Sequence, residues 1–317
     1  MRDVAVSEPI IDDLQKRLGC TDIYGWLDLQ AERLSAFGTD QTSQRVRLTQ
    51  QLFAARSVIG VEQQTNLNQE ACILPVVGGF KIQYRQGLPR ARRRFAIAHE
   101  LGHTYFFQEP GSTQTVSRLQ GAEEPTIEAL CDFFAGTLLL PRQRFLNKMQ
   151  TFGGDGNQRE IPPLHLIPML AQEFAVAPQA VARRMVFDIF ASHRVVFCVK
   201  RSVGELTGPW HTVWYAASID LHRRTPTGWR IALDSHGRTF PPELIPDTPN
   251  GETKFVMIDG RLHAAANPQS PDESRKPISK RIPLPSQSAL VARCFADSDL
   301  FSSQAEFAFV AIQSNEQ

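Results

Sequence analysis

The segment His99-Glu100-Leu101-Gly102-His103 constrains this chain more than any other feature of its sequence. It has the pattern H-E-x-x-H and lies between apolar residues, so it is predicted to belong to a buried helix. Residues four apart share a helix face, so the imidazoles of His99 and His103 can bind one metal ion. Glu100 then lies where its carboxylate can accept a proton from a water molecule. The pattern predicts the metal helix of a zinc hydrolase with one Zn²⁺ per chain, for which Mn²⁺ is the expected substitute.

A second apolar helix is predicted over residues 127–140, and Pro141 ends it. Its only acids, Glu128 and Asp132, are four residues apart and therefore share a face. A buried carboxylate is costly unless it is paired or binds a metal ion. We therefore expect Glu128 to be the third metal ligand and Asp132 to accept a hydrogen bond from a ligand histidine. The reverse assignment of these two acids stays open.

Taken together, the two segments resemble the ImmA/IrrE family of zinc metallo-endopeptidases. The resemblance is carried by residues 92–103 and by residues 128–141, and it extends over residues 70–190. It implies metal ligands at His99, His103 and Glu128, with Glu100 as the general base. Relatives often have Asn at the position of Asp132, so its role is less strongly implied than those of the ligands.

The resemblance also implies an activity and a partner. Family members typically cleave a helix-turn-helix repressor, which releases the genes under its control after DNA damage or in prophage and defence loci. This implies a repressor substrate encoded nearby, derepression of stress, DNA-damage or antiviral genes, and single-stranded DNA as a candidate activator. Two alternatives are a DNA-binding regulator with a structural metal site and an inactive, antitoxin-like binding protein. Glu100 argues against both, because neither needs a general base beside the metal.

The fold class predicted is α+β, in three parts. Residues 1–70 are expected to form the N-terminal helical part of the peptidase region. Residues 71–192 are expected to form a mainly helical, zincin-like metallopeptidase core with a small β-sheet, ending in a helix-turn-helix-like segment. The remaining residues, 193–317, are rich in β-branched and aromatic residues and predict a β-rich, GAF-like domain that acts as a sensor.

Local patterns predict the elements within these parts. Apolar spacing predicts helices over residues 10–18, 24–37 and 45–59, and residues 72–84 predict two strands across a Gly-Gly turn. Residues 170–185 have the pattern of a helix-turn-helix, for which both structural packing and DNA binding stay open. Further strands are predicted over residues 195–200, 211–217, 229–233, 254–258, 261–264, 288–295 and 306–312, with a flexible insertion over 268–285.

The five cysteines are scattered and contain no C-x-x-C pair. In a reducing compartment we expect free thiols that are buried as small hydrophobic groups. A second hypothesis is that the thiol of Cys72 or Cys20 occupies the open metal position and keeps the enzyme latent.

Four arginines crowd the start of the predicted metal helix, at Arg90, Arg92, Arg93 and Arg94. Positive charge at a helix N-terminus opposes the helix dipole, so a compensating interaction is expected. One hypothesis is ion pairing with acids of the N-terminal helices. The other is an anion contact, with a nucleic-acid phosphate or an acidic stretch of substrate, at Arg90, Arg93 and Arg94.

The overall composition is that of an ordinary globular protein, with 42% hydrophobic and 21% charged residues. The net charge of +1 provides no general attraction to nucleic acid or membranes. The chain has no apolar run near the ~18 residues of a membrane span, and its first residues lack a signal-peptide core. A cytoplasmic protein without a membrane partner is expected.

Overall fold

The structure is a computed structural model. It describes residues 8–38, 45–107, 125–152 and 166–188, and strands between residues 194 and 314, with side chains described only up to residue 186. The chain divides into two compact units. One comprises residues 1–148 and 170–181, and the other comprises residues 149–169 and 182–317. The division into three parts expected from the sequence stays a prediction.

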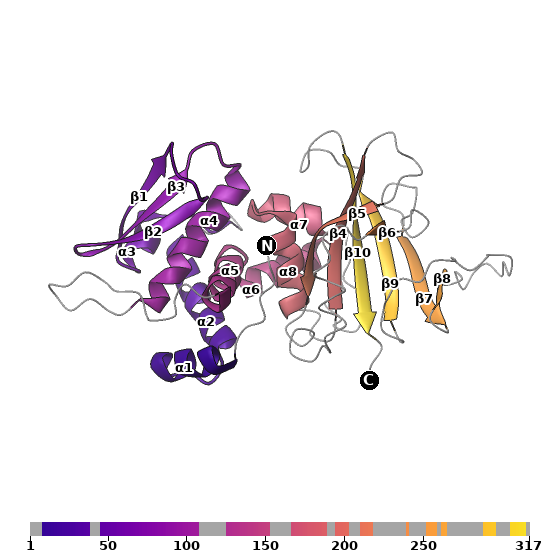
Figure 1. Ribbon diagram of the computed structural model, residues 1–317, viewed down its shortest axis with the longest axis horizontal. Helices are drawn as coiled ribbons and strands as arrows, with labels where there is room; N and C mark the ends of the chain where they lie inside the picture. The colour runs from indigo at the N-terminus through magenta and orange to yellow at the C-terminus, as the bar shows by residue number, and fades with distance from the viewer. Residues whose placement is uncertain are drawn as a thin grey trace. The chain divides into compact units, whose positions relative to one another are not determined.

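The first unit is built in layers around the metal helix (Figure 1). Its sheet has the order β1-β3-β2, in which β1 runs parallel and β2 antiparallel to β3. Helix α4 packs against β2 and β3, α5 packs against α4, and α2 packs against α5. The strands are β1 (Val58–Gln64), β2 (Ala71–Val76) and β3 (Gly79–Arg85), and the helices are α1 (Glu8–Leu18), α2 (Ile23–Ser35), η1 (Ala36–Gly38), α3 (Gln50–Ala54), α4 (Arg90–His103), η2 (Thr104–Phe106), α5 (Pro125–Leu139) and α6 (Arg142–Thr151). This arrangement confirms a helix-rich α+β region with a small sheet.

Helix α2 forms because apolar residues recur on one face and a polar side chain caps its start. In α2 the Asp22 carboxylate accepts a hydrogen bond from the backbone N–H of Tyr24 at 3.1 Å, which caps the helix. The buried face of α2 carries Ile23, Leu27, Ala31 and Leu34, a spacing of about one helical turn. Among the described residues, no helix combines the length and the apolarity that crossing a membrane requires.

The expected helix over residues 45–59 is wrong for most of its length. Helix α3 covers only Gln50–Ala54, and strand β1 begins at Val58. Thr49 caps α3, and Ser57 adopts a φ of 55° between the helix and the strand. The β-branched residues from Val58 onward favour a strand, and pairing with β3 supplies backbone hydrogen bonds that a longer helix would have satisfied internally.

The hairpin predicted over residues 72–84 is confirmed as β2 and β3. Gly78 and Gly79 have φ values of 84° and 147°, which other residues rarely adopt. A Cβ on Gly79 would also overlap the carbonyl oxygen of Ser57. Glycine at this position therefore allows the turn to lie directly against the start of β1.

The helix-turn-helix pattern is confirmed as α7 (Leu166–Phe174) and α8 (Pro178–Asp188). Ala175, with a φ of 54°, forms the turn, and Pro178 is the first residue of α8. Arg184, one of the two cations of the segment, is only 3% exposed. Since a buried guanidinium cannot bind DNA phosphates, the structure favours packing as the role of this segment.

The strands of the second unit form one sheet with the order β6-β5-β4-β10-β9-β7-β8, in which every neighbouring pair is antiparallel (Figure 1). They are β4 (Arg194–Ser202), β5 (Trp210–Ala217), β6 (Thr239–Phe240), β7 (Glu252–Ile258), β8 (Arg261–Ala264), β9 (Ser288–Phe295) and β10 (Ala305–Ser314). Six of the seven expected strands are confirmed. The strand expected at 229–233 and the insertion expected at 268–285 lie outside the described residues. A GAF-like fold for this unit stays a prediction.

Candidate metal centre

Helix α4 places the two motif histidines on one face. The Nε2 atoms of His99 and His103 lie 3.2 Å apart, and both imidazoles are largely buried. Two ring nitrogens that approach so closely are suited to sharing one cation. The face that the sequence pattern predicts is therefore formed in the structure.

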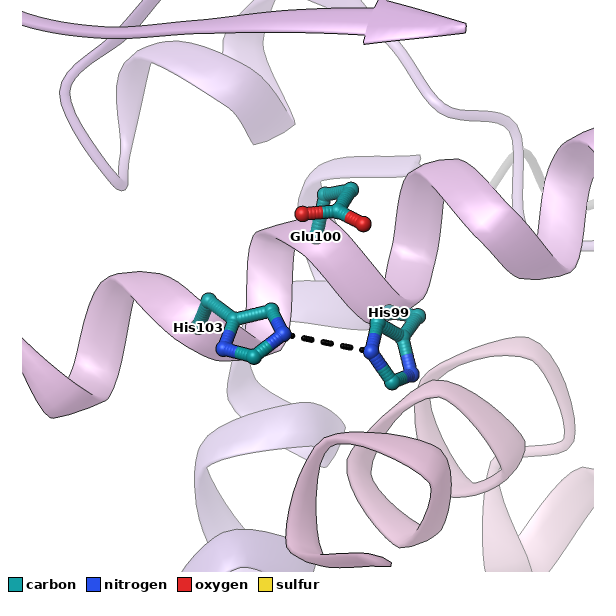
Figure 2. A group of neighbouring side chains, drawn as sticks. All are labelled: His99, Glu100 and His103. Carbon is teal, nitrogen blue, oxygen red and sulfur yellow. Dashed lines mark hydrogen bonds between the residues drawn. The ribbon is translucent and has the colours of Figure 1, made fainter. Parts of the chain in front are cut away.

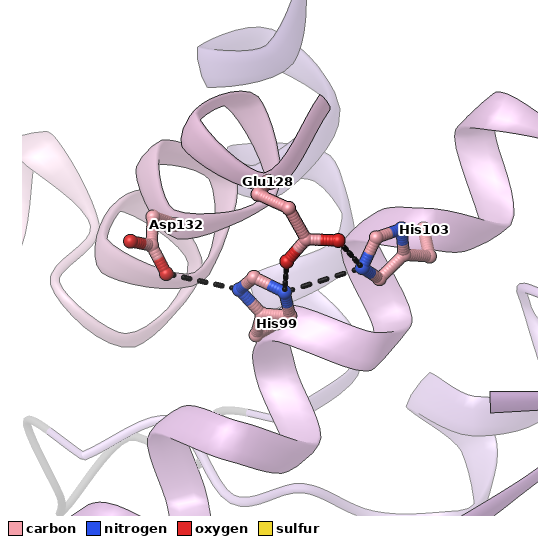
Figure 3. A network of polar contacts seen from close by, with 4 residues as sticks. All are labelled: His99, His103, Glu128 and Asp132. Atoms are coloured by element: carbon pink, nitrogen blue, oxygen red, sulfur yellow. Dashed lines mark hydrogen bonds and ion pairs between the residues drawn. The ribbon is translucent and has the colours of Figure 1, made fainter. Parts of the chain in front are cut away.

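Helix α5 brings a carboxylate to this pair of nitrogens (Figure 3). An oxygen of Glu128 lies 3.1 Å from His99 Nε2, and its other oxygen lies 3.4 Å from His103 Nε2. The Glu128 side chain is 54% exposed, whereas the imidazoles of His99 and His103 are 15% and 7% exposed. The cluster is therefore closed on the side of α4 and accessible on the side of Glu128.

The distances within the cluster match those between ligands of a tetrahedral zinc ion. Zinc ligands lie about 2.0–2.1 Å from the metal, so neighbouring ligand atoms are about 3.3–3.4 Å apart in a tetrahedron. The separation of 3.2 Å between the two nitrogens is close to this value, and the two oxygens of Glu128 lie at 3.1 Å from one nitrogen and 3.4 Å from the other. Two imidazoles and one carboxylate are also a common donor set of catalytic zinc sites.

Asp132, one turn after Glu128 on α5, contacts the other nitrogen of His99 (Figure 3). Its carboxylate oxygen lies 2.9 Å from His99 Nδ1. Burial disfavours the charged form of His99, but hydrogen bonds to Asp132 and Glu128 and the charges of Asp132 and Glu100 outweigh burial and raise its pKa from 6.5 to about 10. In the metal-free protein His99 is therefore an imidazolium at neutral pH, and a metal ion must displace its proton.

Glu100 is the third member of the group on α4. Its carboxylate, His99 and His103 each offer a donor atom within 4.8 Å of the others, so this group can hold a metal ion. Figure 2 shows Glu100 on the side of the helix that faces a strand, whereas the imidazoles project from another side. Glu100 is 8% exposed, so its carboxylate lies at a partly desolvated position beside the cluster.

Comparison with known families agrees with this geometry. Residues 81–186 match the family model Peptidase_M78, described as the IrrE N-terminal-like domain. Residues 81–186 are therefore similar to an IrrE N-terminal-like domain. The match confirms the resemblance to the ImmA/IrrE family. The matched residues contain α4, α5 and the cluster, and they are here called the M78 domain.

Two other comparisons add no functional information. No curated protein matches this chain significantly. The solved structure of a Mycobacterium tuberculosis transcriptional regulator aligns over 91% of this chain and 76% of that chain, with 15% sequence identity and a TM-score of 0.46. A similarity at this level supports no conclusion about this chain.

Within the M78 domain, Gly102 allows α4 and α5 to approach closely. A Cβ on Gly102 would lie 3.1 Å from the ring of Phe134 and 3.3 Å from the Cα of Cys131. Both distances are shorter than ordinary van der Waals contact. Because Glu128 and Asp132 reach the histidines from α5, this small residue helps to set the geometry of the cluster.

Arg56 holds the end of the metal helix, a role that the sequence did not reveal. Its guanidinium donates to Thr104 Oγ1 at 2.9 Å and to the carbonyl oxygen of Thr104 at 3.0 Å. The same group lies 3.7 Å from the centre of the Tyr105 ring. A cation at a helix C-terminus is stabilising, and this contact fixes the backbone next to His103. Arg56 lies outside any motif, so no sequence signal marked it.

The structure does not bring either candidate thiol into the cluster. Among the described histidines, cysteines and acids, the metal-binding group contains no cysteine. On β2 the buried side chains of Ala71 and Ile73 alternate with Cys72, which therefore lies on the opposite face of the sheet. Cys20 lies between α1 and α2, and burial followed by the charge of Asp22 raises its thiol pKa, which disfavours the thiolate.

The arginines at the start of α4 differ in their contacts. Arg92 forms an ion pair with Glu70, which directly precedes β2 and does not belong to the N-terminal helices. Arg93 lies 5.8 Å from the centre of the Tyr84 ring. Arg94 donates to the carbonyl oxygen of Val46 at 2.8 Å. Among the described residues, the expected ion pairs with acids of the N-terminal helices are not found for these arginines.

Proposed function

We propose that this chain is a zinc-dependent endopeptidase that cleaves a helix-turn-helix repressor encoded nearby. Cleavage would derepress stress, DNA-damage or phage-defence genes. The observation that carries the proposal is the spacing of His99 Nε2, His103 Nε2 and the Glu128 carboxylate, which corresponds to three ligands of one tetrahedral zinc ion. The M78 match supports the peptidase activity, and the repressor substrate rests on the family resemblance.

In this proposal Glu128 is the third ligand and Asp132 orients His99. The Glu128 oxygens lie against the Nε2 atoms of both histidines, whereas Asp132 contacts Nδ1 of His99. An imidazole that donates from Nδ1 keeps the lone pair on Nε2 available for a metal. Zinc held by these three residues would remain accessible to water or substrate, as in catalytic zinc sites.

Glu100 is the general base. Zinc bound by these residues would supply Lewis acidity, which acidifies a water molecule and polarises a carbonyl group. The Glu100 carboxylate accepts the proton from the attacking water and delivers it to the leaving amine. Glu100 is only 8% exposed, so its carboxylate lies beside the cluster rather than in bulk solvent.

Strand β2 is the expected binding edge for an extended substrate. It is an outer strand of the sheet and packs against α4. The backbone N–H of Phe80 on β3 points away from β2 and donates to the carbonyl oxygen of Ser57. Pro75, the residue of β2 opposite Phe80, is therefore at a position without backbone hydrogen bonds to β3. By alternation, the backbone groups of Ala71 and Ile73 also point outward, where a substrate strand can pair with them.

The C-terminal unit is proposed to be the GAF-like sensor of the trigger, with single-stranded DNA as the activator to test and the cytoplasm as the location. Its antiparallel sheet agrees with a β-rich domain, and the sensor role rests on the family resemblance.

The proposal is tested with the full chain and the helix-turn-helix protein encoded next to it. The two are mixed with zinc, with and without single-stranded DNA, and products are identified by mass spectrometry. We expect one discrete cut that Glu100→Gln reduces by at least about 10²-fold while zinc content is unchanged. The matched control is Glu62→Gln, which removes a carboxylate paired with Lys81 on the sheet and should leave cleavage intact.

Other outcomes point to the alternative functions. Cleavage by Glu100→Gln at the wild-type rate would refute the peptidase mechanism. A stable complex without cleavage would indicate a binding protein, and tight binding of duplex DNA with a filled fourth zinc position would indicate a regulator with a structural metal.

A further inference from the structure

We infer that Arg45, Arg90 and Arg94 form a binding site for phosphate groups, separate from the metal centre. Arg90 and Arg94 are four residues apart on α4 and therefore share a face. Arg94 Nη2 donates to the carbonyl oxygen of Val46 at 2.8 Å, which brings α4 next to the segment that begins at Arg45. Arg45 is held there by hydrogen bonds from its guanidinium to the carbonyl oxygens of Glu173 at 2.8 Å and Gln172 at 3.2 Å.

This cluster lies on the side of α4 opposite the metal ligands. Arg90 precedes His99 by nine residues, and Arg94 precedes His103 by nine residues. At about 100° per residue, nine residues correspond to about 900°, which is two full turns and a half. A ligand at the arginines would therefore not occupy the catalytic side of the helix, and its binding can be measured independently of peptidase activity.

Two of the three positive charges of the cluster, those of Arg90 and Arg94, lie on α4. Among the described residues, neither Arg90 nor Arg94 forms an ion pair with a carboxylate, in contrast to Arg92, which pairs with Glu70. Burial, followed by the nearby charges of Arg90 and Arg45, lowers the pKa of Arg94 to about 10. The Nε of Arg94 is also buried without a hydrogen-bond partner. An anion at the cluster would relieve this repulsion.

The chemistry of the side chains favours phosphate over other anions. Guanidinium groups present paired N–H donors that match two oxygens of one phosphate, and three of them can surround a single group. The same chemistry is offered by inorganic pyrophosphate and by the backbone of a nucleic acid. The site would bind either source, and the probes below distinguish them.

The test measures thermal unfolding and binding of the full, zinc-loaded protein. The probes are pyrophosphate and a single-stranded DNA oligonucleotide, each compared with sodium chloride at equal ionic strength. We expect at least one probe to raise Tm and Arg90→Gln to weaken its binding by about tenfold or more. The matched control is Arg92→Gln, which removes the same charge from the same helix outside the cluster and should retain nearly full binding.

A second readout separates a binding site from general electrostatics. Without a probe, Arg90→Gln should raise Tm, because it removes a repulsive cation from the neighbourhood of Arg94. Arg92→Gln should not raise Tm, because it breaks the ion pair with Glu70.

Pyrophosphate binding would identify a small phosphate site, and binding of the oligonucleotide alone would identify a nucleic-acid contact. The inference is overturned if neither probe binds, if both variants weaken binding equally, or if polyglutamate binds as tightly as the phosphate probes.

Discussion

The Nδ1 atom of His99 lies 2.9 Å from a carboxylate oxygen of Asp132, and this contact decides which ring nitrogen faces the candidate metal position. Because Asp132 accepts the Nδ1–H, Nε2 points toward Glu128 and His103, and loss of its proton would leave its lone pair available for a metal ion. The two acids of α5 thus contact different nitrogens of the same imidazole.

Removing Glu128 should lower zinc affinity more than removing Asp132. We expect Asp132→Ala to weaken zinc binding by about 10–100-fold, because the histidine is then no longer oriented. Asp132→Asn should have a smaller effect, since its amide oxygen can still accept the Nδ1–H. Glu128→Ala removes the proposed third ligand, and its effect should exceed both. Competition with a chelator measures all three, and the opposite order would reverse the two roles.

The stability of the metal-free protein should depend on the protonation of His99. The pKa of His99 in the folded protein, about 10, is above the ordinary value of 6.5. Its contribution to the free energy of unfolding is therefore fully present below pH 6.5 and is lost as the pH rises through about 10. In urea unfolding at pH 6, 8 and 10 with a chelator present, the free energy of unfolding of the wild type should fall relative to that of His99→Gln as the pH rises. Parallel pH profiles would contradict the raised pKa.

Gly102 and Gly136 should respond in opposite ways to alanine. Gly102→Ala places a methyl group 3.1 Å from the Phe134 ring, so we expect a loss of about 1–3 kcal/mol in the free energy of unfolding. Gly136 lies in α5 with no atom within 4 Å of an added Cβ, so Gly136→Ala should be neutral or stabilise by up to about 1 kcal/mol. Denaturant unfolding measures both, and equal effects would refute the close helix contact.

Replacing the two candidate thiols should leave the metal centre unchanged. Cys72 lies on the sheet face away from α4, and Cys20 lies outside the metal-binding group. We expect Cys72→Ser and Cys20→Ser to keep wild-type zinc affinity and cleavage rate. Increased cleavage by either variant would instead support a thiol that keeps the enzyme latent.

Local sequence patterns correctly predicted those elements whose conformation depends on residues nearby in the sequence. The hairpin of β2 and β3, the turn before Pro178 and the strands of the second unit follow from glycine, proline and β-branched residues nearby in sequence. The helix expected over residues 45–59 failed because its apolar spacing fits a helix, whereas pairing with β3 is a contact between distant segments. Apolar spacing alone does not distinguish these cases.

The candidate site shows the same difference between local patterns and contacts of distant segments. The sequence by itself determined that His99 and His103 share a helix face, because a spacing of four residues has the same consequence in any α-helix. It also marked Glu128 and Asp132 as a pair of acids in an apolar helix. Only the tertiary structure decided which nitrogen each acid contacts, that Arg56 holds the end of α4, and that Arg45 joins Arg90 and Arg94. These contacts join segments far apart in the chain, so their distances depend on how closely the helices pack, which no local pattern specifies.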